Sequence, residues 1–160
     1  MRVLSIVAAT LLLAILLSIM AWPSPWHHMA PMWTLLVLIY WATAFPRRVG
    51  VLAGFATGLI LDALQGSTFG VHAIPLALGC YIAISIHSRM RLAPVWQQAI
   101  IVLLIAFLVR GLELWLRGAL GAPVDAAWFA IAPLTTALLW PVVFWSLRSV
   151  RRSLLLHLIE

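Results

Sequence analysis

The ionisable side chains that could carry out chemistry in this chain are few, and they fall into two short groups. Asp62 and His72 are ten residues apart, and a carboxylate beside a histidine could relay protons. Arg110, Glu113 and Arg117 follow at spacings of three and four residues, which places them on one face of a helix. We expect Arg110 or Glu113 to join Asp62 and His72 in one polar cluster. The alternative is an ion pair within one helix whose arginine extends toward the membrane surface.

Catalytic and metal-binding motifs are missing from the sequence. There is no His-Glu-x-x-His pair, cysteine-based metal motif, phosphate-binding glycine loop or recognisable serine–histidine spacing. The adjacent His27 and His28 have no cysteine or carboxylate neighbours that would complete a metal site. Cys80 is the single cysteine, and its apolar surroundings predict a buried hydrophobic residue. We therefore expect no enzyme activity, no cofactor and no metal.

The composition determines the solvent in which these side chains must lie. Of the 160 residues, 65% are hydrophobic and 9% are charged, whereas soluble domains average about 25% charged residues. This excludes a soluble enzyme, a disordered tail and a disulfide-stabilised secreted domain. The net charge of +6 comes from arginines in short runs between apolar stretches, so we do not expect a nucleic-acid partner.

Six apolar stretches predict an all-α integral membrane protein with six transmembrane helices in a single domain, residues 1–160. The stretches are 3–21, 32–45, 49–64, 69–86, 94–116 and 126–147. The second and third are short for a bilayer core of about 30 Å. Residues 148–160 alternate arginine with leucine, which predicts a short cytoplasmic helix at the membrane interface or a surface for a cytoplasmic protein.

The arginines predict how the helices are oriented. The segments on the side of the N-terminus contain Arg2, Arg47, Arg48, Arg89, Arg91, Arg148, Arg151 and Arg152, and the opposite side contains only Arg117. Basic residues favour the cytoplasmic side, so both termini are expected there, with the inner arginines near anionic lipid. The tryptophans predict two interfacial belts: Trp22, Trp26, Trp33, Trp115 and Trp128 on the outer side, and Trp41, Trp96 and Trp145 on the inner side.

A glycine repeat marks the third stretch. Gly50, Gly54 and Gly58 recur every four residues, and Asp62 and Gly66 continue the spacing, so all five share one helical face. Small residues on one face predict a close internal helix crossing or a groove for a partner helix. An isolated carboxylate in the outer half of a membrane is costly, so Asp62 must cap the next helix, reach the interface, or serve a binding or transport role.

The segment between the third and fourth stretches predicts a compact outer turn. Gly66 and Gly70 permit positive φ angles, and Ser67 and Thr68 offer hydroxyl groups that could cap the following helix. His72 enters the fourth stretch from the same side. It could satisfy the nearby aspartate or relay a proton with it.

Residues 33–73 resemble the rod shape-determining protein MreD family. That family shows a Tyr-Trp-x(n)-Pro stretch followed by the pattern G-L-x-L-D-x-L-x-G-x-x-x-G-x-H-A. The matching residues are Tyr40, Trp41, Pro46, Gly58, Leu59, Leu61, Asp62, Leu64, Gly66, Gly70, His72 and Ala73. The chain length and the number of apolar stretches also fit the family.

The resemblance implies a non-catalytic scaffold of the cell-elongation complex in the bacterial inner membrane. Such a protein is expected to bind MreC, a single-span periplasmic protein, and to help maintain rod shape and direct peptidoglycan synthesis. MreB filaments, a RodA-type glycosyltransferase and a penicillin-binding transpeptidase are the further partners implied. The candidate surfaces for MreC are the outer ends of the third and fourth helices, the loop 22–33 and the glycine face.

A second class of function is the substrate-binding membrane component of an energy-coupling-factor vitamin transporter, which has a similar size and helix number. In that case Asp62, His72, Arg110 and Glu113 would line a pocket that opens outward. Copurification of a small molecule would distinguish this class from a scaffold.

Overall fold

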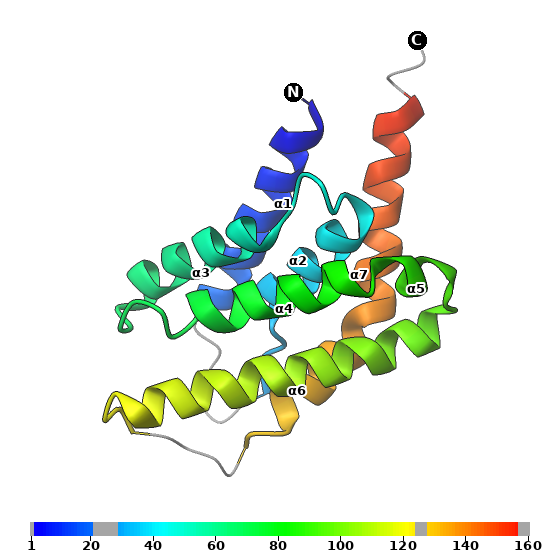
Figure 1. Cartoon of the computed structure of the whole chain (residues 1–160). Coiled ribbons are helices and arrows are strands. Elements are labelled where there is room, and N and C mark those ends of the chain that lie inside the picture. Colours follow the sequence, from blue (N-terminus) through cyan, green and yellow to red (C-terminus); the bar gives the residue numbers. More distant parts are fainter. Residues whose placement is uncertain (1, 21–28, 124–127, 157–160) are drawn as a thin grey trace.

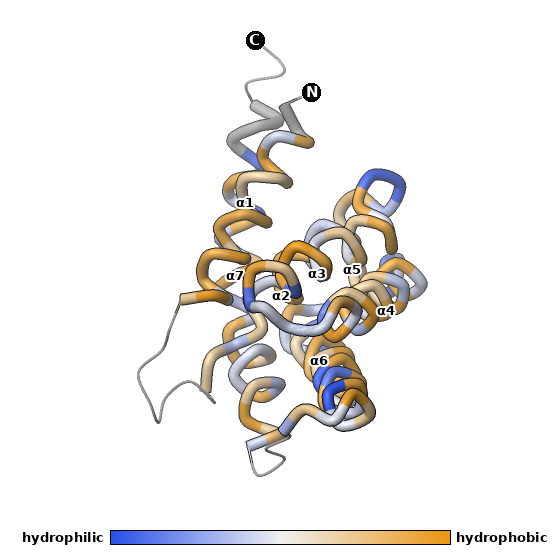
Figure 2. Tube along the Cα trace, turned by 90° about the vertical axis from the view of Figure 1, so that its left-hand side faces the viewer, coloured by the Kyte–Doolittle hydropathy of each residue, from blue (hydrophilic) through white to orange (hydrophobic). Residues whose placement is uncertain are grey.

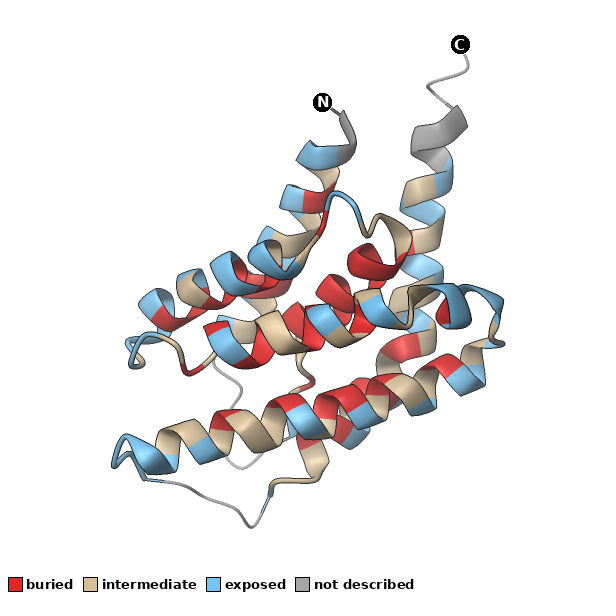
Figure 3. Cartoon of the chain, in the orientation of Figure 1, coloured by how far each residue is buried: buried red, intermediate tan, exposed pale blue. Residues whose placement is uncertain are grey.

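Helix α2 (Trp33–Ala44) lies at the centre of the computed structural model, which describes residues 2–20, 29–123 and 128–156. Every residue from Thr34 to Thr43 is buried. The helix has apolar residues on all sides and no polar face, so it is stable only when other helices enclose it. Figure 3 shows this helix almost entirely in the colour of buried residues.

Six further helices occur in the described part of the chain, and all of them except α3 pack against α2 (Figure 1). They are α1 (Arg2–Ile19), α3 (Val51–Gln65), α4 (Ala73–Ser85), α5 (His87–Leu92), α6 (Val95–Ala119) and α7 (Ile131–Leu156). Helix α3 packs mainly on α4, and α6 packs on both α4 and α7. The described residues form no strand, which confirms the predicted all-α class. Two of the helices, over Val95–Ala119 and Ile131–Arg152, are long and apolar enough to cross a membrane.

The fourth apolar stretch and the C-terminal tail differ from the prediction. The residues that begin the fourth stretch form a turn, so α4 starts only at Ala73, and a separate short helix, α5, follows it. The tail is not a separate interfacial helix in the described residues, because α7 continues without interruption to Leu156. Residues 142–156 contain neither glycine nor proline, so no residue in this segment favours a break.

The outer surface is apolar, and several of the most polar side chains are inside. Leu52, Leu104 and Leu138 are exposed, whereas Asp62 and Glu113 are buried. Figure 2 shows hydrophobic colours along much of the helical part of the chain. Water favours the reverse arrangement, so this distribution suits helices surrounded by lipid.

Hydroxyl groups connect the central helix region to its neighbours. The hydroxyls of Ser18 in α1 and Thr34 in α2 lie 2.8 Å apart. The backbone N–H of Met32 donates to Oγ1 of Thr136 in α7 at 2.9 Å. Where lipid surrounds helices, burying apolar side chains provides little driving force for the helices to associate. Polar contacts of this kind then help to hold them together.

The predicted inner tryptophan belt is wrong for one member. Trp41 is fully buried on the enclosed helix α2, and its Nε1 donates to Thr10 Oγ1 at 2.9 Å. By contrast, Trp96, Trp115 and Trp145 are exposed, as interfacial anchors would be. Trp22 and Trp26 lie outside the described residues.

Candidate functional site

Asp62 closes the connection between α3 and α4 by binding the first turn of α4. Its Oδ2 accepts the backbone N–H groups of Gly70 at 2.9 Å and Ala73 at 3.3 Å, and its Oδ1 accepts the N–H of His72 at 3.0 Å. Oδ1 also accepts the Ser67 hydroxyl at 2.8 Å. Helix N-termini present unpaired N–H groups and a partial positive charge, so they favour an anion. The buried carboxylate is therefore the cap of the next helix.

The turn over residues 66–72 adopts the geometry that its glycines permit. Gly66 ends α3 with φ of +64°, and Gly70 has φ of +104°. Both values lie in the region that favours glycine. The sequence predicts that the Ser67 hydroxyl could cap α4. In the structure this hydroxyl donates to Asp62 instead. The predicted turn is confirmed. Of the alternatives given for Asp62, the one in which it caps the next helix is the one that the structure shows.

His72 connects the Asp62 carboxylate to α6. Its Nδ1 lies 2.7 Å from Asp62 Oδ1, and its Nε2 lies 3.3 Å from Glu113 Oε1. Five donors face the Asp62 carboxylate, counting His72 Nδ1, so an ionised carboxylate fits this site. An ionised carboxylate only accepts hydrogen bonds, so His72 Nδ1 carries a proton.

The second nitrogen of His72 has two mutually exclusive partners. Arg117 Nη2 lies 3.3 Å from Nε2, the same separation as Glu113 Oε1. A protonated Nε2 donates to Glu113, whereas an unprotonated Nε2 accepts from Arg117. In both charge states Nδ1 still donates to Asp62. The histidine can therefore change its charge without leaving Asp62 unpaired.

Glu113 is the hub of the ion pairs. Arg110 Nη1 donates to both of its oxygens at 3.0 Å, and Arg117 Nη2 lies 2.8 Å from Oε1. Glu113 is almost completely buried, and the two arginines are partly exposed. With His72 neutral, two carboxylates balance two guanidinium groups. Such pairing is what makes a buried carboxylate tolerable.

The structure brings together all four ionisable residues chosen from the sequence. Glu113 is the member that contacts His72 directly, while Arg110 joins through Glu113. The sequence predicts Arg117 on the same helix face but not in the cluster, although its position four residues after Glu113 is the spacing of an ion pair. We call Asp62, His72, Arg110, Glu113 and Arg117 the polar cluster.

The glycine repeat forms an internal crossing between α3 and α4. A Cβ added at Gly54 would lie 2.7 Å from Cys80 Sγ, and one at Gly58 would lie 2.6 Å from the backbone nitrogen of Ala73. Helix α4 therefore occupies this face, and the predicted alternative of a groove for a partner helix is wrong there. Gly50 has no neighbour within 4 Å of an added Cβ, so it takes no part in the crossing.

A cavity of about 330 Å³ lies beside the polar cluster. His72, Glu113 and the two cluster arginines line its polar side, and residues such as Leu35 line its apolar side. Asp62 is fully buried and is not among the lining residues. The volume is at the lower end of the range for small-molecule sites, about 300–1,000 Å³. No group of three or more potential metal ligands occurs among the described residues.

Comparisons with known proteins agree on one family. A sequence model of the rod shape-determining protein MreD matches residues 1–150. The rod shape-determining protein MreD of Haemophilus influenzae is 33% identical over 145 residues, which cover 91% of this chain and 90% of that protein. No solved structure matches the chain. The transporter alternative gains no support from these comparisons.

Proposed function

Since the chain belongs to the family of the rod shape-determining protein MreD, we propose that it is a non-catalytic membrane scaffold of the bacterial rod complex. The family supports a role in the determination of rod shape. In the proposed role the protein binds an MreC-like single-span periplasmic protein and helps direct peptidoglycan synthesis. The match over residues 1–150 is the observation that carries this proposal.

The proposed placement is a six-span protein of the inner membrane with both termini in the cytoplasm. The spans are α1, α2, α3, α4, α6 and α7, and α5 lies at the inner surface. The distribution of arginines and the apolar outer surface support this placement. Helix α2 is only about 18 Å long at 1.5 Å per residue, but it is enclosed by protein, so its ends need not reach both lipid surfaces.

Cysteine labelling tests this placement. The native Cys80 is completely buried, so it contributes little background. A membrane-impermeant maleimide should label Phe69→Cys, in the outer turn, on intact spheroplasts. It should label Leu92→Cys, which is 89% exposed at the end of α5, only after permeabilisation. The opposite pattern, or labelling of both from one side, would overturn the proposed orientation.

We place the contact with the periplasmic partner at the outer turn, residues 66–72. Asp62 fixes this turn by five hydrogen bonds, so its shape is determined before any partner binds. Phe69 at its tip is 69% exposed. Aromatic side chains are enriched in protein interfaces, and a turn that is already ordered costs less to bind. The inner arginines would face MreB, the RodA-type glycosyltransferase, the penicillin-binding transpeptidase or lipid.

Coexpression with an MreC-like protein tests the proposed contact. Phe69→Ala should lower the amount of MreC-like protein recovered by affinity purification about tenfold or more, as expected for a central interface aromatic. Trp115→Ala is the matched control, because Trp115 is 67% exposed on α6 and lies outside the turn. Full recovery with Phe69→Ala, or equal loss with both variants, would contradict this location. The scaffold role is tested separately, by whether the wild-type chain recovers the MreC-like protein at all.

A further inference from the structure

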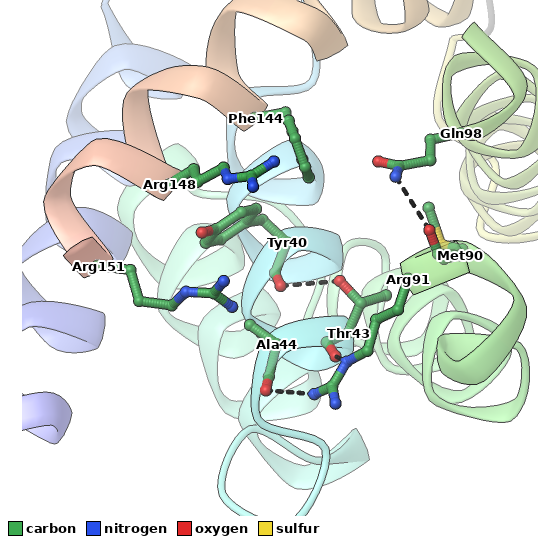
Figure 4. Close-up of a pocket in the computed structure, with 9 residues that line it drawn as sticks. All are labelled: Tyr40, Thr43, Ala44, Met90, Arg91, Gln98, Phe144, Arg148 and Arg151. Carbon is green, nitrogen blue, oxygen red and sulfur yellow. Dashed lines mark hydrogen bonds between the residues drawn. The ribbon is translucent and has the colours of Figure 1, made fainter. Parts of the chain in front are cut away.

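A second cavity lies at the other end of α6 from the polar cluster. Its volume is about 410 Å³, and it is bounded by α2, α5, α6 and α7 (Figure 4). The residues important for its chemistry are Tyr40, Arg91, Gln98, Phe144, Arg148 and Arg151. Gln98 is fifteen residues from Glu113 on α6, which corresponds to about 22 Å. We call this cavity the arginine pocket.

Acceptor groups around the arginine pocket already have donors. Arg91 caps the C-terminal end of α2, since its Nε donates to the carbonyl of Thr43 at 2.9 Å and its Nη2 to the carbonyl of Ala44 at 2.6 Å. The Gln98 amide donates to two carbonyl groups at the end of α5, at 2.9 and 3.0 Å. Its oxygen accepts Trp140 Nε1 at 3.2 Å. The wall is thus fixed in place, and these acceptors are satisfied.

Donors in the same pocket are left without partners. Tyr40 is 3% exposed, and its buried hydroxyl has no hydrogen-bond partner in the structure. The buried Nε of Arg151 has none either. Figure 4 shows the Tyr40 ring between the side chains of Arg148 and Arg151. A buried donor without an acceptor is unfavourable, so these groups indicate a missing acceptor.

No carboxylate side chain of the described residues lines the arginine pocket or pairs with Arg148 or Arg151. The carboxylate side chains among the described residues are Asp62 and Glu113, and both belong to the polar cluster. Arg148 is held over aromatic rings instead, with its Cζ 5.8 Å from the Phe144 ring centre and 5.5 Å from that of Trp145. An anion would both accept from these donors and balance the charge of Arg148 and Arg151.

We propose that the arginine pocket binds the phosphate group of an anionic membrane lipid headgroup. Guanidinium groups match phosphate oxygens in geometry and charge, and the Tyr40 hydroxyl supplies a further donor. The exposed Trp145 beside the pocket and the exposed Leu92 at the end of α5 suit a position at the membrane interface. Lipid phosphate is the abundant anion at that level. The proposal rests on the membrane placement given above, but it does not depend on the periplasmic partner.

Lipid retention and thermal stabilisation test the proposal. The purified full chain is placed in nanodiscs of phosphatidylcholine alone or with a minor fraction of cardiolipin. The protein is then released from the nanodiscs, and the lipid that stays bound to it is measured by native mass spectrometry. The double variant R148Q/R151Q should bind cardiolipin about tenfold more weakly or worse, and Y40F should bind it several-fold more weakly. R47Q/R48Q is the matched control, because it removes the same number of charges from exposed arginines that do not line the pocket.

The outcomes separate the possible sources of the phosphate. Retained cardiolipin on the wild type and on R47Q/R48Q, with loss on R148Q/R151Q and partial loss on Y40F, supports the proposal. In a second experiment, inorganic phosphate is added to lipid-free protein in detergent, and the change in Tm is measured. Stabilisation by inorganic phosphate without selective lipid retention would overturn the lipid source and assign the site to a soluble phosphate. Equal binding by all variants, or equal loss with both double variants, would overturn the pocket.

Discussion

Replacing Asp62 with asparagine should destabilise the connection between α3 and α4. The hydrogen bonds of Asp62 give the smallest number of donors that this change leaves unpaired. Asparagine keeps one acceptor oxygen, but it replaces the other oxygen with an NH₂ group that cannot accept. If the amide occupies the Oδ2 position, the N–H groups of Gly70 and Ala73 lose their acceptor. If it occupies Oδ1, three donors from Ser67 and His72 lose theirs. At least two donors around a fully buried site are therefore left unpaired.

The magnitude follows from the number of unpaired donors. Each buried donor without an acceptor costs about 1–3 kcal/mol, so D62N should lower the free energy of unfolding by roughly 2–6 kcal/mol. For a chain of this size, 1 kcal/mol corresponds to about 2–4 °C in Tm, so Tm should fall by at least about 4 °C. The nine tryptophans allow the purified protein in detergent to be followed by intrinsic fluorescence during heating.

Ser67→Ala is the control for this prediction. It removes the hydroxyl donor together with its bond to Asp62, so four donors still face the carboxylate and no donor is left unpaired. The expected loss is about 1 kcal/mol or less. A D62N protein that melts within about 1 °C of the wild type, or a Ser67→Ala protein that melts as low as D62N, would refute the assignment of Asp62 as a helix cap.

Three further comparisons of variants test the packing and the cluster. Gly58→Ala should force α3 and α4 apart and lower Tm by several degrees in the same assay, whereas Gly50→Ala, which has open space around it, should leave Tm nearly unchanged; equal effects would contradict the internal crossing. Thr136→Val leaves the Met32 N–H unpaired and should cost about 1–3 kcal/mol in denaturant unfolding, while Thr135→Val, whose hydroxyl bonds only within α7, serves as its control. In a double-mutant cycle, E113Q and D62N should be non-additive, since His72 joins the two carboxylates, and strict additivity would argue against this connection.

The helix positions could be predicted from the sequence because their ends have local causes. The third apolar stretch, 49–64, corresponds to α3 over Val51–Gln65, which begins after Gly50 and ends at Gly66. The fifth, 94–116, corresponds to α6, which begins directly after Pro94. Glycine and proline impose these boundaries through the backbone alone.

Tertiary features were harder to predict, because one sequence pattern allows several neighbours. The full burial of Trp41 depends on α2 being enclosed, and a tryptophan near the end of an apolar stretch is equally compatible with an interface. The sequence does not distinguish Gly79 from other glycines, yet a Cβ there would lie 3.0 Å from Leu35 Cδ1 and 3.1 Å from Val109 Cγ2. A single glycine has no spacing, so only the packed neighbours reveal its role.

The polar cluster was partly predictable from the sequence. A carboxylate deep in an apolar chain requires partners, and this requirement connected Asp62 to His72 and to the charged residues of the fifth stretch. The spacing of residues 110, 113 and 117 could not show which side chain faces α4. The structure shows that Glu113 does, with Arg110 and Arg117 on either side of it.

Copurification from native membranes tests the central proposal most directly. The chain, tagged at its C-terminus, is extracted gently from its own membranes, and the associated proteins are identified by mass spectrometry. A scaffold of the rod complex should bring with it an MreC-like single-span protein, together with MreB or the peptidoglycan synthases. Recovery of a transmembrane coupling subunit with its ATPases, and no MreC-like protein, would contradict the proposed function.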